Sequence, residues 1–382
     1  MAVVFLPVVI LAAVPFCLWI ATAKSASGRV AGWTAFSVVT ALVALVVVSR
    51  LPSRDWRHLL LVAVPLMSAM GLVALLIRWA PSRWERRAEG PGLHSVFLDE
   101  APRRGFLDLV PEVDRVTLGA ALLTRLDPWM RADHARRTRR VLADFYEEMA
   151  QDPSTHDLAT TANEPFLELA GIPFDSKHYD VYVPKYEKSE RLGLLVFLHG
   201  NAGNLQVVSW AWKTFADRER YVVVSPSYGF GFWGGGCERA VQKVVEHVMS
   251  YLPIDKARVV LGGVSDGGNG VTRVGGARPD LFAALIYVSP TLVVHEVTAS
   301  EFLAGWKGRP VLVLQGDEDH NVVKKDVDRA VRAMSARGVA ITYQVFPGED
   351  HFLLFGRRRD VCERVAEWQA RFASLGPTPP SR

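Results

Sequence analysis

The chain opens with three long apolar stretches, at about residues 2–23, 30–49 and 59–80, and charged residues occur only near their ends. Each stretch has 20 to 22 residues. An α-helix rises about 1.5 Å per residue, so each stretch would span roughly 30 Å, close to the thickness of a bilayer's hydrocarbon layer. The pattern therefore predicts a membrane region over residues 1–80 with three transmembrane helices.

The first apolar stretch allows a second interpretation. It ends in Ala21-Thr22-Ala23, which resembles a signal-peptidase site, but no positive charge precedes the apolar run, so we expect a retained helix. With three helices in place, the flanking Lys and Arg residues favour a C-terminal part that faces the cytoplasm. We therefore expect a multi-pass protein of a bacterial inner membrane.

Residues 81–160 form a different region, which we expect to be a polar linker followed by a helical arm. Apolar positions recur with helical spacing over about residues 110–125 and 128–151. The second pattern is rich in arginine and then turns acidic at Glu147 and Glu148. The arginines could rest on anionic lipid headgroups, which would make membrane lipid a partner, or they could form an ordinary solvated helix face.

Beyond residue 160 the pattern changes to short apolar runs that alternate with amphipathic segments. Strand-like runs occur at 178–183, 194–198 and 221–225 and again near Val259, Leu285 and Val311. Between them, residues 238–252 place their valines on one helical face. Alternating strands and helices predict a mostly parallel sheet covered on both faces. We place this α/β domain at residues 161–376 and expect residues 377–382 to be a disordered tail.

Charge and cysteine content exclude several classes of protein. Residues 1–80 hold six of the 44 Lys and Arg residues but one of the 40 acids, so the remainder is close to neutral. The basic pI thus gives no reason to expect a nucleic-acid partner. The three cysteines have no metal-ligand spacing, and we expect neither a metal nor a cofactor.

The chemistry is indicated by a serine between glycines, in Gly263-Val264-Ser265-Asp266-Gly267, directly after an apolar run. A nucleophile on a sharp strand-to-helix turn needs glycines two residues before and after it, because those positions press against neighbouring backbone. Downstream, the chain carries Gly316-Asp317-Glu318-Asp319 and then Asp350-His351, each just past a strand-like run. Serine, acid and histidine in this order are typical of a hydrolase triad on an α/β sheet.

From about residue 177 to 374 the sequence resembles the α/β-hydrolase family. The segments that carry the resemblance are the serine strand and turn over residues 254–268, the helix end and strand over 277–289, and His199-Gly200-Asn201 after a strand. The serine segment looks like that of esterases of the dienelactone-hydrolase and carboxylesterase type. The resemblance implies an α/β-hydrolase fold for this half of the chain.

The resemblance also implies roles for individual residues. Ser265 would be the nucleophile, His351 the base that activates it, and Asp319 the acid that orients the histidine. The family places its acid fourth in the turn that starts at Gly316, which selects Asp319 and leaves Asp317 as the alternative. The oxyanion hole would be formed by the amide of Asp266 and by that of Asn201, or of Ala202 in second place.

An aromatic, glycine-rich run follows the strand near residue 225. Its aromatic residues could form an apolar wall for substrate, or a buried cluster beneath a loop; they are Tyr228, Phe230, Phe232 and Trp233. The connection between Ser289 and Val311 is too short for a sizeable cap over the site. No Gly-Lys-Ser/Thr follows the glycines, so the run is not a phosphate-binding loop.

Together these features predict a membrane-anchored serine hydrolase that cleaves a carboxylic ester or thioester through an acyl-enzyme. Its substrate would be a small-molecule or lipid-like ester. A peptidase of the same fold, or a hydrolase fold that serves as a non-catalytic binding or signalling module, are the alternatives. The oligomeric state is left open by the sequence.

Overall fold

The structure is a computed structural model that describes Ser37 and residues 84–101, 112–126, 132–155, 178–201, 203 and 205–373. The chain divides into two compact units. One comprises Met1–Ser82, Arg103–Ala143 and Thr160–Asn163, and the other comprises Arg83–Pro102, Asp144–Ala159 and Glu164–Arg382.

The predicted membrane spans, at about residues 2–23, 30–49 and 59–80, lie outside the described residues except for Ser37. Within the ranges that the structure does describe, no helix combines the length and the apolar character that crossing a membrane requires. The three spans therefore stay predictions. The tail predicted over residues 377–382 also lies outside the described residues.

The first unit contains one of the two helices that the spacing predicted between residues 110 and 151, together with the first part of the other. Helix α4 covers Glu112–Leu126, and helix α5 covers Ala132–Ala150. The guanidinium of Arg139 on α5 donates a 2.6 Å hydrogen bond to the hydroxyl of Thr124 on α4. From Asp144 onward, α5 belongs to the second unit.

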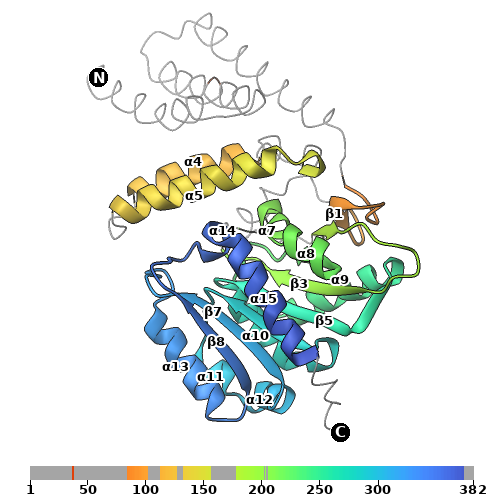
Figure 1. Ribbon diagram of the computed structural model, residues 1–382, viewed down its shortest axis with the longest axis vertical. Helices are drawn as coiled ribbons and strands as arrows, with labels where there is room; N and C mark the ends of the chain where they lie inside the picture. The colour runs from red at the N-terminus through yellow and green to blue at the C-terminus, as the bar shows by residue number, and fades with distance from the viewer. Residues whose placement is uncertain are drawn as a thin grey trace, which may run out of the picture. The chain divides into compact units, whose positions relative to one another are not determined.

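The second unit is built on an eight-stranded sheet with the strand order β1-β2-β4-β3-β5-β6-β7-β8 (Figure 1). Strand β2 is antiparallel to both of its neighbours, and all other neighbours from β4 to β8 run parallel. This confirms the prediction of a mostly parallel sheet. The strands are β1 Gly92–Phe97, β2 His178–Val183, β3 Leu192–Leu198, β4 Tyr221–Pro226, β5 Ile254–Val264, β6 Ala284–Val288, β7 Pro310–Gly316 and β8 Ala340–Phe346.

The central strands are apolar because both faces of the sheet are covered by helices (Figure 1). Every residue of β3 and β6 is buried, as expected for parallel strands packed on both sides. Helix α15 packs against α8 and β7, and helix α10 packs against α9, α12 and β5. The helices are α7 Gln206–Ala211, α8 Lys213–Glu219, α9 Cys237–Tyr251, α10 Gly267–Ala277, α11 Val294–Val297, α12 Ser300–Trp306, α13 Lys324–Ser335, α14 Leu353–Gly356 and α15 Arg358–Ala373.

Helix α9 shows why the valine spacing predicted a helix that covers the sheet. Val241, Val244, Val245 and Val248 recur at intervals of three and four residues, and all four are buried in the main core. The opposite face of the helix carries Glu and Lys residues. The helix therefore buries one apolar stripe and leaves a polar one in solvent.

Strand β1 differs from the prediction, since it lies within the segment expected to be a polar linker. Residues Gly92–Phe97 pair antiparallel with β2, from Gly92 opposite Val183 to Phe97 opposite His178. A buried hydrogen bond of 2.7 Å from Ser95 Oγ to Asp180 Oδ1 links the two strands. The sheet thus begins well ahead of residue 161, with a short edge strand whose few apolar residues gave only a weak pattern.

Candidate active site

The serine turn has the strained geometry that a nucleophile on an α/β sheet requires. Strand β5 ends at Val264, Ser265 has a φ of 55°, and helix α10 begins at Gly267. A φ in the left-handed region is costly for a residue with a side chain. A Cβ on Gly263 would lie 2.6 Å from the carbonyl oxygen of Gly267, and one on Gly267 would lie 2.3 Å from that of Leu198. The two glycines are therefore needed for the backbone to pass.

The structure brings the three residues of the predicted triad together. His351 Nε2 lies 3.0 Å from Ser265 Oγ, and His351 Nδ1 lies 2.9 Å from Asp319 Oδ2. An ionised carboxylate can only accept, so the proton of the neutral imidazole is assigned to Nδ1. Nε2 is then the acceptor that faces the serine hydroxyl. This arrangement can remove a proton from Ser265 as its oxygen attacks.

The Asp319 carboxylate is held from several directions. Its side chain is fully buried, yet it accepts hydrogen bonds from the amides of Asn321 (3.0 Å) and Val322 (2.8 Å) and from Gln315 Nε2 (3.1 Å), besides His351. These donors satisfy the oxygens of a buried carboxyl group and fix its orientation. The carboxylate therefore has one oxygen in a set position for the imidazole.

Asp317, the alternative acid, serves a different contact. Its Oδ1 accepts a hydrogen bond of 2.6 Å from the amide of Gly348. Gly348 has a φ of 70° and lies in the loop that leads from β8 to His351. Asp317 thus ties the acid turn to the histidine loop, whereas Asp319 contacts the imidazole itself.

Two polar residues near the site were not singled out from the sequence. Gln315, the second-last residue of β7, donates to both Asp319 Oδ2 and the carbonyl of Val322. Thr291, in the loop after β6, donates through its amide to the carbonyl of Ser265 (2.9 Å) and through its hydroxyl to Asp266 Oδ1 (2.7 Å). The available signal was the glutamine directly after the apolar run Val311-Leu312-Val313-Leu314, because a buried polar side chain must have partners.

The loop after β3 lies directly against Ser265. A Cβ on Gly200 would lie 2.9 Å from Ser265 Cβ, so only a glycine allows this approach. Asn201, predicted to supply an oxyanion amide, follows in an exposed turn, and Ala202 lies outside the described residues. Asp266, the other predicted donor, stands at the N-terminus of α10, where backbone N–H groups favour negative charge.

His199 connects this loop to the start of the aromatic run after β4. It is fully buried, its Nε2 accepts from the amide of Tyr228 (3.2 Å), and its Nδ1 contacts the carbonyl oxygen of Gly200 at 2.7 Å. The tautomer that fits both contacts carries its proton on Nδ1. Burial lowers the pKa of His199 to about 4, against the opposing effect of the Gly200 carbonyl. His199 is therefore a neutral structural residue.

The aromatic run after β4 divides into a buried and an exposed part. Trp233 is fully buried, stacks on Tyr228 with a centroid separation of 5.2 Å, and donates through Nε1 to the carbonyl of His199 (2.9 Å). The alternative of a buried cluster beneath the loop therefore describes Trp233, which is not part of an open pocket wall. Phe232 is 50% exposed and lies against Phe230, with a centroid separation of 5.2 Å.

The connection from β6 to β7 contains two short helices, α11 and α12. Helix α12 packs against α10 rather than forming a separate domain. In the part of the chain that the structure describes, no group of three or more His, Cys, Asp or Glu residues is arranged to hold a metal ion. Both described cysteines, Cys237 and Cys362, are free and buried, and burial raises the pKa of each thiol to about 11.

Comparison with known proteins gives one family match and several distant relatives. Residues 294–374 match the prolyl oligopeptidase family, Peptidase_S9. A protein named "probable dipeptidyl-peptidase 5" in Aspergillus terreus is 26% identical over 245 residues, which cover 51% of this chain and 34% of the fungal protein. The chain thus spans about a third of the length of this relative.

Solved structures are also similar to about half of this chain. A thermostable esterase is 21% identical, with a TM-score of 0.43 over 51% of this chain and 58% of the esterase. Fluorophosphonate-binding serine hydrolase F of Staphylococcus aureus is 14% identical, with a TM-score of 0.45 over 50% of this chain and 92% of that protein. The fold assignment rests on the sheet order and the serine turn rather than on these likenesses.

The strand order, the serine turn and the family match support a serine hydrolase of the α/β-hydrolase superfamily. The matched family segment begins at Val294 and includes both Asp319 and His351. The serine turn and the loop after β3 precede it and complete the site.

Proposed function

We propose that this chain is a serine hydrolase that cleaves carboxylic esters or thioesters through an acyl-enzyme. The observation that carries the proposal is the hydrogen-bonded series Asp319–His351–Ser265, with separations of 2.9 and 3.0 Å. Ser265 Oγ would attack the carbonyl carbon while His351 Nε2 takes its proton. His351 would then give that proton to the leaving alcohol or thiol, and water would release the acyl group by the same route.

The oxyanion formed in each step needs preorganised donors. The amide of Asp266 is the natural first donor, because it follows the nucleophile and begins helix α10. The amide of Asn201 is the proposed second donor, since Gly200 holds its loop against Ser265. Phe230 and Phe232 are proposed to contact the apolar part of the substrate.

Fluorophosphonate labelling tests the chemistry without knowledge of the substrate, because the probe needs only an activated serine. The wild-type chain should be labelled and should hydrolyse p-nitrophenyl esters, and Ser265→Ala should abolish both while the circular-dichroism spectrum is unchanged. The loss in kcat should be on the order of 10⁴-fold or more, because triad residues act as a unit. A folded wild-type chain that neither reacts nor turns over would indicate a non-catalytic binding or signalling module.

A peptide bond is the second candidate for the cleaved group. It is favoured by the match of residues 294–374 to the prolyl oligopeptidase family and by the relatives named dipeptidyl-peptidase. Dipeptidyl p-nitroanilides and p-nitrophenyl esters of rising acyl length, assayed side by side, separate the two. A higher kcat/KM on the anilides would assign a peptidase.

We also propose that the hydrolase is anchored in the membrane by residues 1–80 and faces the cytoplasm. The support is the three apolar stretches and the excess of Lys and Arg on one side of them. A C-terminal alkaline-phosphatase fusion is active only when exported, so it should be inactive here. Strong phosphatase activity would place the hydrolase on the exported side. Recovery of the unfused chain in the fraction that alkaline carbonate releases from membranes would contradict the proposed anchor.

A further inference from the structure

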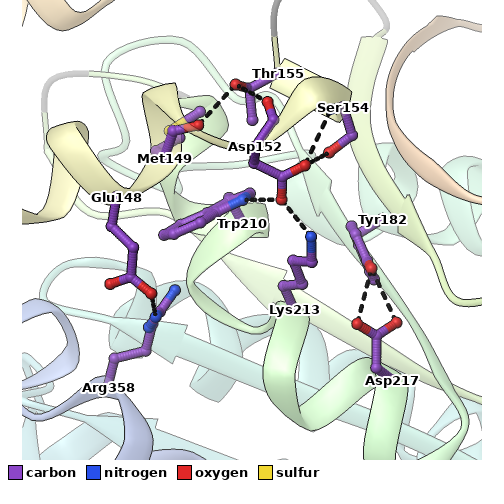
Figure 2. Close-up of polar contacts among 10 residues, drawn as sticks. All are labelled: Glu148, Met149, Asp152, Ser154, Thr155, Tyr182, Trp210, Lys213, Asp217 and Arg358. Atoms are coloured by element: carbon purple, nitrogen blue, oxygen red, sulfur yellow. Dashed lines mark hydrogen bonds and ion pairs between the residues drawn. The ribbon is translucent and has the colours of Figure 1, made fainter.

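The end of helix α5 and the short helix η2 (Pro153–Thr155) form a segment, residues 144–155, that packs onto the hydrolase helices (Figure 2). We call it the docking segment. It precedes the catalytic strands β2 to β8 in the chain and lies outside residues 294–374, the part that matches a known family. Two groups of contacts attach it, one at Asp152 and one at Arg358 (Figure 2).

The first attachment is a buried carboxylate. Asp152 accepts hydrogen bonds from Trp210 Nε1 (2.9 Å), from Lys213 Nζ and from both the amide (3.0 Å) and the hydroxyl (2.8 Å) of Ser154. Burial alone would raise its pKa, but the hydrogen bonds, led by that of Lys213, hold the pKa well below its usual range. Asp152 is therefore ionised, and it ties η2 to helices α7 and α8.

The second attachment is an arginine between two aromatic rings. Arg358 begins α15 and is 7% exposed. Its guanidinium carbon lies 4.5 Å from the centroid of the Trp210 ring and 5.3 Å from that of Phe145, and it forms an ion pair with Glu148. Stacking and ion pairing of a largely desolvated guanidinium are favourable. The pairing holds the last turns of α5 against the start of α15.

A series of aromatic rings leads from the docking segment to the catalytic histidine. Phe145, 4% exposed, packs edge-on against Phe355 of α14 with a centroid separation of 5.4 Å. Phe355 lies 6.3 Å from Phe352, and Phe352 lies edge-on to His351 at 6.1 Å. Helix α14 begins two residues after His351. Movement of Phe355 would therefore move the loop that carries the imidazole.

We propose that Phe145 is a positioning residue for catalysis, whose ring holds α14 so that His351 stays within hydrogen-bonding distance of Ser265. This inference rests on the proposed serine-hydrolase chemistry. The loop has other supports, including the hydrogen bond from the Phe352 amide to Asp350 Oδ1 (2.9 Å). Loss of the ring should therefore loosen the histidine without unfolding the sheet. A displacement of about 1 Å at a reacting group costs roughly 10²-fold in rate.

The test compares two variants of the docking segment in the full-length chain purified in detergent. Phe145→Leu removes the ring beside α14. Ser154→Ala, the matched control, removes one hydrogen bond to Asp152 and so weakens that attachment. Asp152 itself is unsuitable because its partner Trp210 packs edge-on against Phe145 at 5.2 Å. Both variants should lower the thermal midpoint. Only Phe145→Leu should slow fluorophosphonate labelling and kcat on a p-nitrophenyl ester, by roughly 10- to 100-fold at unchanged KM.

Phe355→Leu extends the test along the ring series. It should reproduce the loss in kcat, and the double variant Phe145→Leu/Phe355→Leu should be little slower than either single variant, because one path is being broken twice. Labelling of Phe145→Leu within twofold of wild type, equal slowing by Ser154→Ala, or additive losses in the double variant would each overturn the inference. If Phe145→Leu does not fold, the softer Phe145→Met and Phe355→Leu carry the same comparison. If the wild-type chain itself is not labelled, the proposed serine-hydrolase function is contradicted, and this inference, which rests on it, is contradicted as well.

Discussion

Gln315 donates a hydrogen bond of 3.1 Å from Nε2 to Oδ2 of Asp319, the same carboxylate oxygen that faces the imidazole of His351. A second contact, from Nε2 to the carbonyl of Val322 (3.0 Å), fixes the amide in this orientation. The glutamine therefore helps to fix the position of the Asp319 carboxylate.

Replacement of Gln315 by leucine should impair catalysis more than folding. Gln315→Leu keeps the volume but removes the donor, and a hydrogen bond to a charged group is worth about 1.5–3 kcal/mol, so kcat should fall roughly 10- to 100-fold. KM should not change, because the contact lies behind the triad. Gln242→Leu on the exposed face of α9 is the control and should stay within about twofold. A Gln315→Leu enzyme with wild-type kcat would show that Asp319 needs no such support.

The two candidate acids should differ sharply when each is converted to its amide. Asp319→Asn should reduce kcat roughly 10³–10⁴-fold, because the amide favours the wrong imidazole tautomer. Asp317→Asn should be mild, since the Asp317 carboxylate accepts from the amide of Gly348 rather than from the imidazole. Initial rates on one ester at saturating concentration suffice. If Asp317→Asn proved the more damaging variant, the acid would have to be reassigned.

The turn glycine two residues after the nucleophile should not tolerate a methyl group. Gly267→Ala would place Cβ 2.3 Å from the carbonyl oxygen of Leu198, so the serine turn must shift away from β3. We expect a loss of roughly 10²-fold in kcat and of about 1–3 kcal/mol in stability. Gly276→Ala, near the end of the same helix, has its nearest neighbour at 3.7 Å and should stabilise by up to about 1 kcal/mol. Urea unfolding and kcat measure both effects, and equal behaviour of the two variants would contradict the close approach.

Stability should fall as the pH drops below 6.5, with His199 as one cause. Burial lowers the pKa of His199 from 6.5 to about 4 in the folded chain. Unfolding exposes the ring, which then binds a proton below about 6.5. The contribution is thus complete above pH 6.5 and is lost as the pH falls toward 4, by on the order of 3 kcal/mol in total. His178, whose pKa burial lowers to about 3, acts in the same direction.

Urea midpoints at pH 7 and pH 4.5 measure this effect. His199→Gln keeps an acceptor for the Tyr228 amide but cannot titrate, so its stability should depend less steeply on pH than that of the wild type. Parallel pH dependence of the two proteins would mean that His199 is protonated in the folded state.

The proximity of the three residues predicted as a triad could be anticipated from the sequence, because each follows a strand at a position that motif and chain order restrict. Ser265 stands between two glycines, and Asp319 and His351 each follow an apolar run. The apolar runs themselves predicted the parallel strands, since strands buried on both faces are continuous in apolar residues. Ser265, Asp319 and His351 accordingly meet at the same edge of the sheet.

Other features could not be read from the sequence because they depend on pairs of residues far apart in the chain. Glu148 lies in a charged pattern that resembles a solvated helix face, yet it pairs with Arg358, 210 residues away. The apolar pattern of β1 is short, and its partner strand begins 81 residues later, at His178 opposite Phe97. Local periodicity carries no information about such partners.

The place of β1 in the sheet has a consequence for how the protein comes apart. The helices α4 and α5 are inserted in the chain between β1 and β2, which are hydrogen-bonded neighbours along their whole length. A protease that cuts once between residues 101 and 178 would therefore not release the hydrolase as a free fragment. The two pieces would separate on a denaturing gel but migrate together in native buffer. The hydrogen bonds between β1 in the first piece and β2 in the second would hold them together.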